Sequence, residues 1–236
     1  TLMAARARSL VVRVVAQVRG EEQLRAVDRE MALAAEIQSK LVPDVLPEVA
    51  GLEFAHCYMP SRRVGGDYVD VIARPDGSVL GVVADVSGKG FAAALTMSNV
   101  QAVVRTEARA GAPIGVVAAS LNRVLYESSV RGRFVTAVLA ELDPATGKLE
   151  FILAGHCVPA LLPAGTRQWD AASSESGPPL GVLENVDWKT IQTQLPPSGI
   201  AVLFSDGLTD VKNPAGARFG ETRVYEALAR HHGTAA

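Results

Sequence analysis

The spacing of apolar residues predicts a long helix at the start of the chain. Apolar positions recur at intervals of three and four residues, the repeat of an amphipathic helix face and of a coiled-coil seam. The positions that keep this spacing are Leu24, Val27, Met31, Ala34, Gln38 and Leu41, with Gln38 as the polar member. Two interpretations stay open: a helix packed on its own domain, or a linker helix that dimerises. Pro43 and Pro47 predict where the helix ends.

Beyond Leu52 the apolar pattern becomes that of short strands, interrupted by two helices and followed by a third. The expected strands are 52–59, 68–73, 78–84, 134–142, 148–153, 160–163, 188–195 and 200–204, and the expected helices are 91–110, 114–130 and 222–230. Turn residues at 75–78 and 143–147 join two hairpins. Strands grouped in hairpins around two central helices indicate an α+β fold with antiparallel sheets. We therefore expect a helical linker at residues 1–45 and one domain at residues 46–236.

Three aspartates lie beside small residues at or near the ends of expected strands. Asp67 follows two glycines, Asp85 begins the motif Asp-Val-Ser-Gly-Lys-Gly, and Asp206 stands between Ser205 and Gly207. Aspartate and glycine are poor strand residues, so these interruptions need a reason. Mg²⁺ and Mn²⁺ prefer carboxylate, carbonyl and water oxygens, which predicts a metal site. Taken singly, Asp85 is also a candidate helix N-cap and Asp206 a candidate turn residue.

Seven short motifs of this chain occur in the order in which a known superfamily carries them. They are Ile37-Gln38 with Leu41-Val42-Pro43, Val64-Gly65-Gly66-Asp67-Tyr68-Val69-Asp70, Asp85-Val86-Ser87-Gly88-Lys89-Gly90, Phe134-Val135-Thr136-Ala137, Ala154-Gly155-His156, Pro179-Leu180-Gly181-Val182 and Phe204-Ser205-Asp206-Gly207-Leu208-Thr209-Asp210. With these motifs the sequence resembles the protein phosphatase 2C superfamily of metal-dependent (PPM) phosphatases. Within it, the chain is most similar to the bacterial branch of SpoIIE and RsbU-type regulators.

This resemblance implies a fold and a metal site. The fold is a four-layer α-β-β-α sandwich of two antiparallel sheets flanked by helices, with metal ions at one edge between the sheets. Two ions, Mn²⁺ or Mg²⁺, are expected. By the same match Asp85 bridges the ions, Asp67 ligates one and Asp206 the other, and the backbone carbonyl of Val86 is a neighbouring ligand. The three aspartates would then act in catalysis through a metal-bound water.

Other polar residues of the motifs are weaker candidates. Arg62 and Arg63 precede the first aspartate motif and could hold a substrate phosphate, although solvated loop arginines fit them as well. Asp70 and Asp210 fit a hydrogen bond to metal-bound water or a strand-end contact better than direct ligation. For His156 we expect a structural hydrogen bond rather than acid catalysis.

The ends of the chain also carry expectations. The chain begins at Thr1, which suggests an upstream sensor domain. The resembled family closes with a further helix-strand unit that holds an Asp-Asp pair and a last metal ligand, and no such pair follows Asp210. Either that unit lies outside this chain or its ligand has been lost.

Composition narrows the classes of function. The chain has 236 residues, 48% of them apolar, with a net charge of −2 and no basic block, so nothing favours nucleic-acid binding. No apolar run approaches the ~20 residues that a membrane helix needs. Two cysteines make no disulfide framework, and we expect Cys57 and Cys157 to be buried thiols. A cytoplasmic protein fits these features.

The resemblance implies a serine/threonine phosphatase that acts on a phosphorylated STAS-type anti-anti-sigma factor in a sigma-factor partner-switching pathway. A homodimer through the N-terminal helix is a further expectation. The rival is a pseudophosphatase that binds and signals without turnover. A dinucleotide-binding loop at residues 88–93 is excluded, because a helix-helix pattern rather than a βαβ unit follows it.

Overall fold

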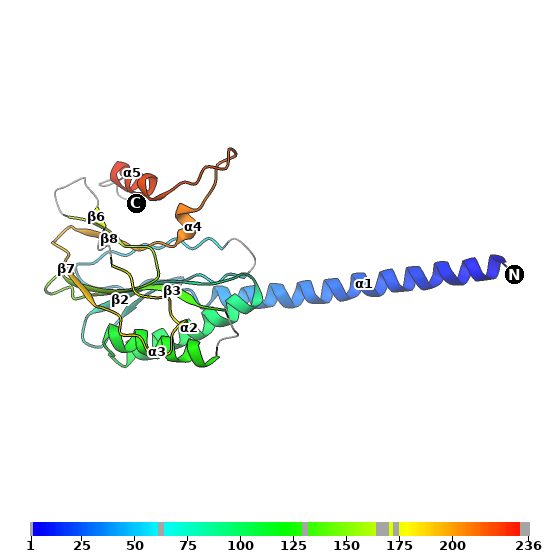
Figure 1. Cartoon of the computed structure of the whole chain (residues 1–236), viewed down its shortest axis with the longest axis horizontal. Coiled ribbons are helices and arrows are strands. Elements are labelled where there is room, and N and C mark those ends of the chain that lie inside the picture. The colour runs from blue at the N-terminus through cyan, green and yellow to red at the C-terminus, as the bar shows by residue number, and fades with distance from the viewer. Residues whose placement is uncertain (1, 61–63, 129–131, 164–169, 172–174, 232–236) are drawn as a thin grey trace.

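The computed structural model describes residues 2–60, 64–128, 132–163, 170–171 and 175–231. Its first element, α1 (Leu2–Ser39), projects far from the rest of the molecule (Figure 1). The seam residues Leu24 and Val27 are exposed, whereas Gln38 is buried. The C-terminal end of α1 therefore packs on the domain, which leaves the seam residues Leu24 and Val27 open.

Two antiparallel sheets form the body of the domain. The five-stranded sheet has the order β1-β2-β3-β4-β7, and the three-stranded sheet has the order β6-β5-β8. The strands are β1 (Tyr68–Ala73), β2 (Val79–Val86), β3 (Val135–Leu142), β4 (Lys148–Ala154), β5 (Ala160–Leu162), β6 (Asp170–Ala171), β7 (Ile191–Gln194) and β8 (Ile200–Val202). The helices after α1 are α2 (Phe91–Arg109), α3 (Ile114–Ser128), α4 (Asp206–Thr209) and α5 (Glu221–His231).

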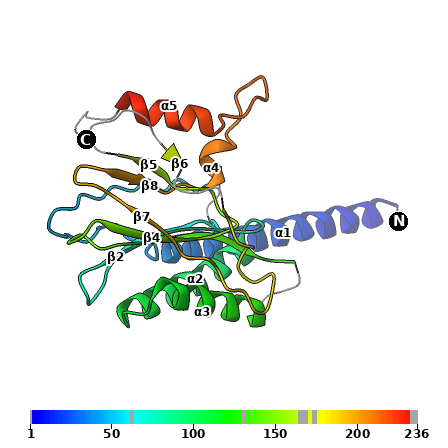
Figure 2. The same ribbon diagram turned by 60° about the vertical axis from the view of Figure 1, so that its left-hand side comes forward.

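Hydrophobic packing separates these elements into successive layers. In Figure 2, α2 and α3 cover one face of the five-stranded sheet, the three-stranded sheet lies over its other face, and α5 lies outermost. Three apolar clusters fill the spaces between them. The largest joins α2 and α3 to β1–β3, the second joins β3 and β4 to residues beside β5 and β8, and the third joins Ala160 and Phe204 to Val224 of α5. The predicted α+β class with antiparallel sheets is confirmed.

The β1–β2 hairpin is the part of the fold that positions the site. Its turn closes with a hydrogen bond from the Arg74 N–H to the Ser78 carbonyl, and Gly77 supplies a positive φ of 86° that other residues rarely adopt. The register pairs Tyr68 with Ala84, and β2 in turn pairs Asp85 with Thr136 of β3. The residue before Tyr68 and the residue after Ala84 therefore lie opposite each other.

Several sequence predictions need correction. Residues 52–59 form no strand, although half-buried and exposed residues alternate there with the period of one. Within the described residues this segment makes only an isolated bridge from Leu52 to Val49, so its alternation reflects one-sided burial rather than sheet pairing. Cys57, expected to be buried, is exposed for the same reason, and Cys157 is only partly buried.

Two strands are also shorter than the sequence predicted. β7 spans four residues, because the segment before it is held by Trp188, whose indole N–H donates to the Pro178 carbonyl. β8 ends at Val202, and Phe204 beyond it packs between Ala160 and α5. The short helix α4 was not predicted. Of the helix expected at 114–130, residues 129–130 lie outside the described part of the chain.

Candidate active site

The β1–β2 hairpin brings the first two predicted aspartates together. Asp67 directly precedes β1, and Asp85 is the penultimate residue of β2, so the register places them face to face. The sequence predicted that Asp85 follows its strand, but the structure places it within β2. It is not a helix N-cap either, because α2 begins at Phe91 after Gly90. The carboxyl groups of Asp67 and Asp85 share a hydrogen bond.

The third aspartate lies at the start of α4, beyond a strand of the other sheet. Asp206 opens α4, directly after Ser205 as its N-cap residue and a few residues beyond β8. Its negative charge acts on both Asp67 and Asp85 and raises the pKa of each carboxyl group. Within the described ranges, however, no three His, Cys, Asp or Glu side chains stand close enough to hold one metal ion. The aspartates therefore form a close pair with a third carboxylate nearby.

Burial and mutual repulsion set the protonation of this group. Burial, then the charges of Asp67 and Asp206, raise the pKa of Asp85 to about 7. Burial also raises the pKa of Asp67, although the hydrogen bond from Asp85 opposes that rise. Carboxylates that repel one another in a partly desolvated place are stabilised in their charged form by a cation. Three carboxylates beside a backbone carbonyl are also the oxygen donor set of a hard divalent ion, so the residues fit Mn²⁺ or Mg²⁺.

Glycine at position 66 lets the chain pass close to Val86. A Cβ at Gly66 would lie 2.9 Å from the Val86 carbonyl oxygen and 3.3 Å from the Cβ of Ala93. Only a residue without a side chain fits there. The Val86 carbonyl, predicted as a metal ligand, thus lies beside the residue that precedes Asp67. On the other side, the Tyr58 hydroxyl donates to the Asp67 carbonyl over 3.3 Å.

Gln38 ties the end of α1 to this segment. Its side-chain amide donates to the Gly65 carbonyl (2.7 Å) and accepts from the Gly65 N–H (3.0 Å). The same amide nitrogen reaches the Ala94 carbonyl of α2 at 3.5 Å. The polar residue of the heptad seam therefore binds the backbone two residues before Asp67, a partner that the seam pattern did not reveal.

The secondary aspartates are engaged elsewhere. Asp70 is bonded to Arg105 and Tyr68, and Asp210 pairs with Arg218 over 2.8 Å. Asp70 thus makes an internal contact from its strand rather than pointing to a metal site. The sequence offered no signal for Arg105, since it lies on α2 outside the seven motifs.

His156 makes the structural hydrogen bond that the sequence predicted. Its Nδ1 lies 2.9 Å from the hydroxyl of Thr136, which is the β3 partner of Asp85 in the sheet. Burial lowers the pKa of His156 to about 4, against a smaller opposing effect of the Phe204 backbone. The imidazole is therefore neutral at pH 7 and braces the strand next to Asp85.

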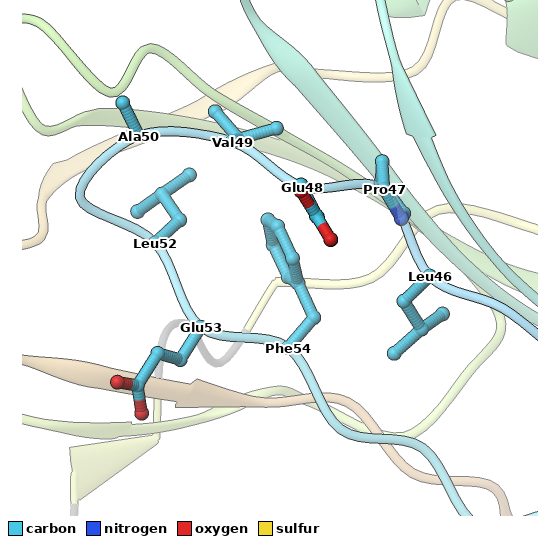
Figure 3. Close-up of a pocket in the computed structure, with 8 residues that line it drawn as sticks. All are labelled: Leu46, Pro47, Glu48, Val49, Ala50, Leu52, Glu53 and Phe54. Carbon is cyan, nitrogen blue, oxygen red and sulfur yellow. The ribbon is translucent and has the colours of Figure 1, made fainter.

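The remaining candidates and hollows add little to the site. Arg62 and Arg63 lie outside the described residues. A hollow of about 730 Å³ is formed by a single loop, in which Leu46, Leu52 and Phe54 gather around the space (Figure 3). Its lining comes from residues 46–54 and includes none of the three aspartates. This hollow therefore does not coincide with the candidate site at the sheet edge.

Comparison with known proteins places this geometry in a family. The family model of stage II sporulation protein E (SpoIIE) matches residues 75–236. Phosphoserine phosphatase RsbU of Bacillus subtilis is 27% identical over 199 residues, which cover 84% of this chain and 58% of that protein. Phosphoserine phosphatase RsbP of the same organism is 24% identical over 188 residues, covering 77% of this chain and 45% of RsbP. The chain thus spans about half the length of these relatives.

A solved structure confirms the fold. The SiaA-PP2C domain of Pseudomonas aeruginosa superimposes with a TM-score of 0.75 at 20% sequence identity. The match covers 88% of this chain and 83% of the SiaA chain. At that identity the likeness establishes the PP2C-type fold alone. Since the SpoIIE model matches well over half of the residues, the chain belongs to the SpoIIE family.

Proposed function

We propose that this chain is a metal-dependent protein serine/threonine phosphatase domain. The observation that carries the proposal is the meeting of Asp67 and Asp85 at one sheet edge, with the charge of Asp206 of α4 acting on both. The similarity to two phosphoserine phosphatases supports the same reaction class. Removal of phosphate from a protein side chain needs an activated water and neutralisation of phosphoryl charge.

The proposed roles follow from the position of each residue. When bound, a pair of Mn²⁺ or Mg²⁺ ions supplies an acidified water and a positive field for the phosphoryl oxygens. Asp85 would contact both ions, Asp67 would ligate one and Asp206 the other, and the Val86 carbonyl would be a neighbouring ligand. Neutral His156 holds Thr136 and thereby the strand beside Asp85. Arg62 and Arg63 remain proposed contacts of the substrate phosphate.

We further propose the substrate and the setting. The substrate would be a phosphorylated STAS-type anti-anti-sigma factor in a partner-switching pathway in the cytoplasm. Among the described helices, none combines the length and apolar composition that a membrane crossing requires. The exposed seam residues Leu24 and Val27 support dimerisation through α1. The Gln38 contacts to Gly65 and Ala94 would pass the state of an upstream sensor to the metal site.

A second candidate is a pseudophosphatase that binds a phosphoprotein without turnover. One observation favours it: the described residues hold no three-carboxylate group that is already close enough for a metal ion. In that case phosphoprotein binding would persist while hydrolysis stayed at background.

Hydrolysis of p-nitrophenyl phosphate and of a phosphoserine STAS protein tests the proposal. We expect phosphate release with Mn²⁺, none with EDTA, and none from Asp85→Ala with Mn²⁺. Lys189→Ala is a matched surface control, because its only described partner is the exposed Glu175. Folded protein that releases no phosphate with Mn²⁺ but binds the phosphoprotein would support the pseudophosphatase instead.

A further inference from the structure

A buried polar cluster links β1 to α2 close to the candidate metal site. The carboxylate of Asp70, fully buried, accepts from Arg105 Nε at 2.7 Å and from Arg105 Nη2 at 3.2 Å. The Tyr68 hydroxyl donates to the same carboxylate over 2.5 Å, and the Val71 N–H donates over 2.9 Å. Each carboxylate oxygen of Asp70 thus accepts two hydrogen bonds from within the protein. This cluster has no place in the phosphatase mechanism described above.

A charge at this place is not required for packing. Tyr68 and Asp70 stand two residues apart on the face of β1 that α2 covers, where the surrounding cluster is otherwise apolar. Apolar residues of similar volume often replace a buried ion pair without loss of stability. An ion pair does differ from apolar packing in one respect, because a two-pronged Arg–carboxylate contact fixes the relative position of its two elements.

One element joined here, β1, directly follows Asp67, and the other, α2, follows the strand that carries Asp85. Asp67 stands three residues before Asp70 on the same segment, and α2 begins five residues after Val86, at the end of Asp85's strand. The two glycines before Asp67 also lie against the start of α2. Gly66 passes close to Ala93, and Gln38 of α1 bridges Gly65 to Ala94. The segment from Gly65 to Asp70 therefore lies along α2, with Arg105 as its farther contact.

We infer that Asp70 and Arg105 are positioning residues for the divalent-ion site. Their ion pair holds β1 on α2 so that Asp67 stays opposite Asp85 and beside the Val86 carbonyl. Neither residue touches the ion or the substrate. The inference rests on the proposed function, since it presupposes that Asp67 and Asp85 bind a metal ion.

The same sheet supplies a matched control. At the other end of β1, the Arg74 side chain is 1% exposed and its Nη1 lies 2.5 Å from Oε1 of Glu141. This second buried ion pair lies near the β1–β2 turn, away from Asp67 and Asp85. Glu141→Gln therefore weakens a buried charge pair of the same kind without touching the segment that carries the candidate ligands.

The experiment titrates the metal-free protein with Mn²⁺ and measures the concentration of free Mn²⁺ by electron paramagnetic resonance. Thermal unfolding in EDTA is measured alongside. We expect Asp70→Asn and Arg105→Gln to weaken Mn²⁺ binding at least tenfold. Arg105→Lys, which keeps the charge but not the two-pronged geometry, should recover part of that loss. Glu141→Gln should lower the unfolding temperature comparably and change Mn²⁺ affinity less than twofold.

Two results would overturn the inference: wild-type affinity in Asp70→Asn, or the same loss of affinity in Glu141→Gln. Should Asp70→Asn fail to fold, Tyr68→Phe and Arg105→Lys give the milder version of the same comparison. A wild-type protein that binds no Mn²⁺ also overturns it. Phosphate release by the wild type is measured separately. Mn²⁺ binding without hydrolysis rejects the proposed function, while the binding comparison still decides the role of Asp70.

Discussion

The two ends of the β1–β2 hairpin both bury charge but balance it differently. At the turn end, Arg74 has Glu141 as its partner and donates to the Ala112 carbonyl, while Asp76 accepts from Ser78. At the open end, Asp67 and Asp85 face each other, and the charges that raise their pKa values are those of other aspartates. At the turn end the charge of Arg74 meets an opposite charge, whereas no cation among the described residues offsets the charges of Asp67 and Asp85. This contrast supports the proposal that the open end is the binding site.

The largest expected effect is the loss of activity when the open end loses its central carboxylate. Asp85→Asn removes the proposed bridging ligand and should lower kcat/KM for a phosphoserine protein by about 10³-fold or more. The same substitution removes repulsion in the metal-free state, so the unfolding temperature in EDTA at pH 8 should rise. Steady-state kinetics and calorimetry measure the two effects. If kcat/KM and the unfolding temperature both fell, Asp85 would stabilise the fold as Glu141 does.

The turn end should respond in the opposite way. Glu141→Gln leaves the Arg74 guanidinium buried without its full counter-charge, and we expect a loss of about 2–3 kcal/mol in the free energy of unfolding. Activity at saturating Mn²⁺ should stay within twofold of wild type. Urea unfolding gives the free energy, with the exposed pair partner Glu175→Gln as a control that should change it by less than about 0.5 kcal/mol. Equal free energies of unfolding for Glu141→Gln and Glu175→Gln would contradict the expected difference between the buried and the surface ion pair.

Gly66→Ala tests how tightly the open end is built. The new methyl group would meet the Val86 carbonyl oxygen at 2.9 Å, so the backbone must shift. We expect a cost of about 1–3 kcal/mol in stability and about a tenfold weaker Mn²⁺ affinity. A Cβ at Gly77, at the turn end, would meet no atom within 4 Å, but this residue has a positive φ of 86°. Gly77→Ala should therefore lower stability through backbone strain and leave Mn²⁺ affinity unchanged, as Mn²⁺ titration of both variants would show.

The two ends should also differ in their response to pH. The folded pKa of Asp85 is raised to about 7, so the folded metal-free protein binds a proton more readily than the unfolded chain between about pH 4 and pH 7. The contribution of Asp85 to stability therefore increases as pH falls through this window. Asp76 has a lowered pKa because Ser78 donates to it, so its contribution is present above its unfolded pKa and is lost on acidification.

Thermal unfolding of the wild type, Asp85→Asn and Asp76→Asn between about pH 3 and pH 8 isolates these contributions. The unfolding temperature of the wild type relative to Asp85→Asn should be higher at pH 5 than at pH 8. The advantage of the wild type over Asp76→Asn in unfolding temperature should shrink as the solution becomes more acidic. Parallel pH profiles for the two differences would contradict the contrast between the ends.

Local signals in the sequence were sufficient for the hairpin and its paired aspartates. Turn residues at 75–78 set the register, and the register alone brings Asp67 opposite Asp85. Asp206 needed the family resemblance, because 120 residues separate it from Asp85 and no local pattern connects the two. In the segment 52–59 the alternation of half-buried and exposed residues was predicted correctly, but the strand was not. Such alternation indicates burial on one side of the chain and does not show that a partner strand exists.

Side-chain partners were the part that the sequence could not supply. Gln38 was recognised as the polar position of a seam, yet its partners are backbone groups of Gly65 and Ala94. Asp70 was expected to bond to metal-bound water or to make a strand-end contact, but its partner Arg105 lies 35 residues away on a helix face. Such pairs depend on how a helix is rotated on a sheet, which the packing of many apolar residues decides together.

The raised pKa of Asp85 has a consequence for the energetics of metal uptake. Near pH 7 part of the metal-free molecules hold a proton on this carboxyl group, and an arriving cation must expel it. Ion binding is then an exchange reaction whose measured heat includes the ionisation heat of the buffer. Calorimetry in two buffers that do not bind the ion and differ in ionisation heat should give different apparent enthalpies, and the difference would report how many protons leave the sheet edge.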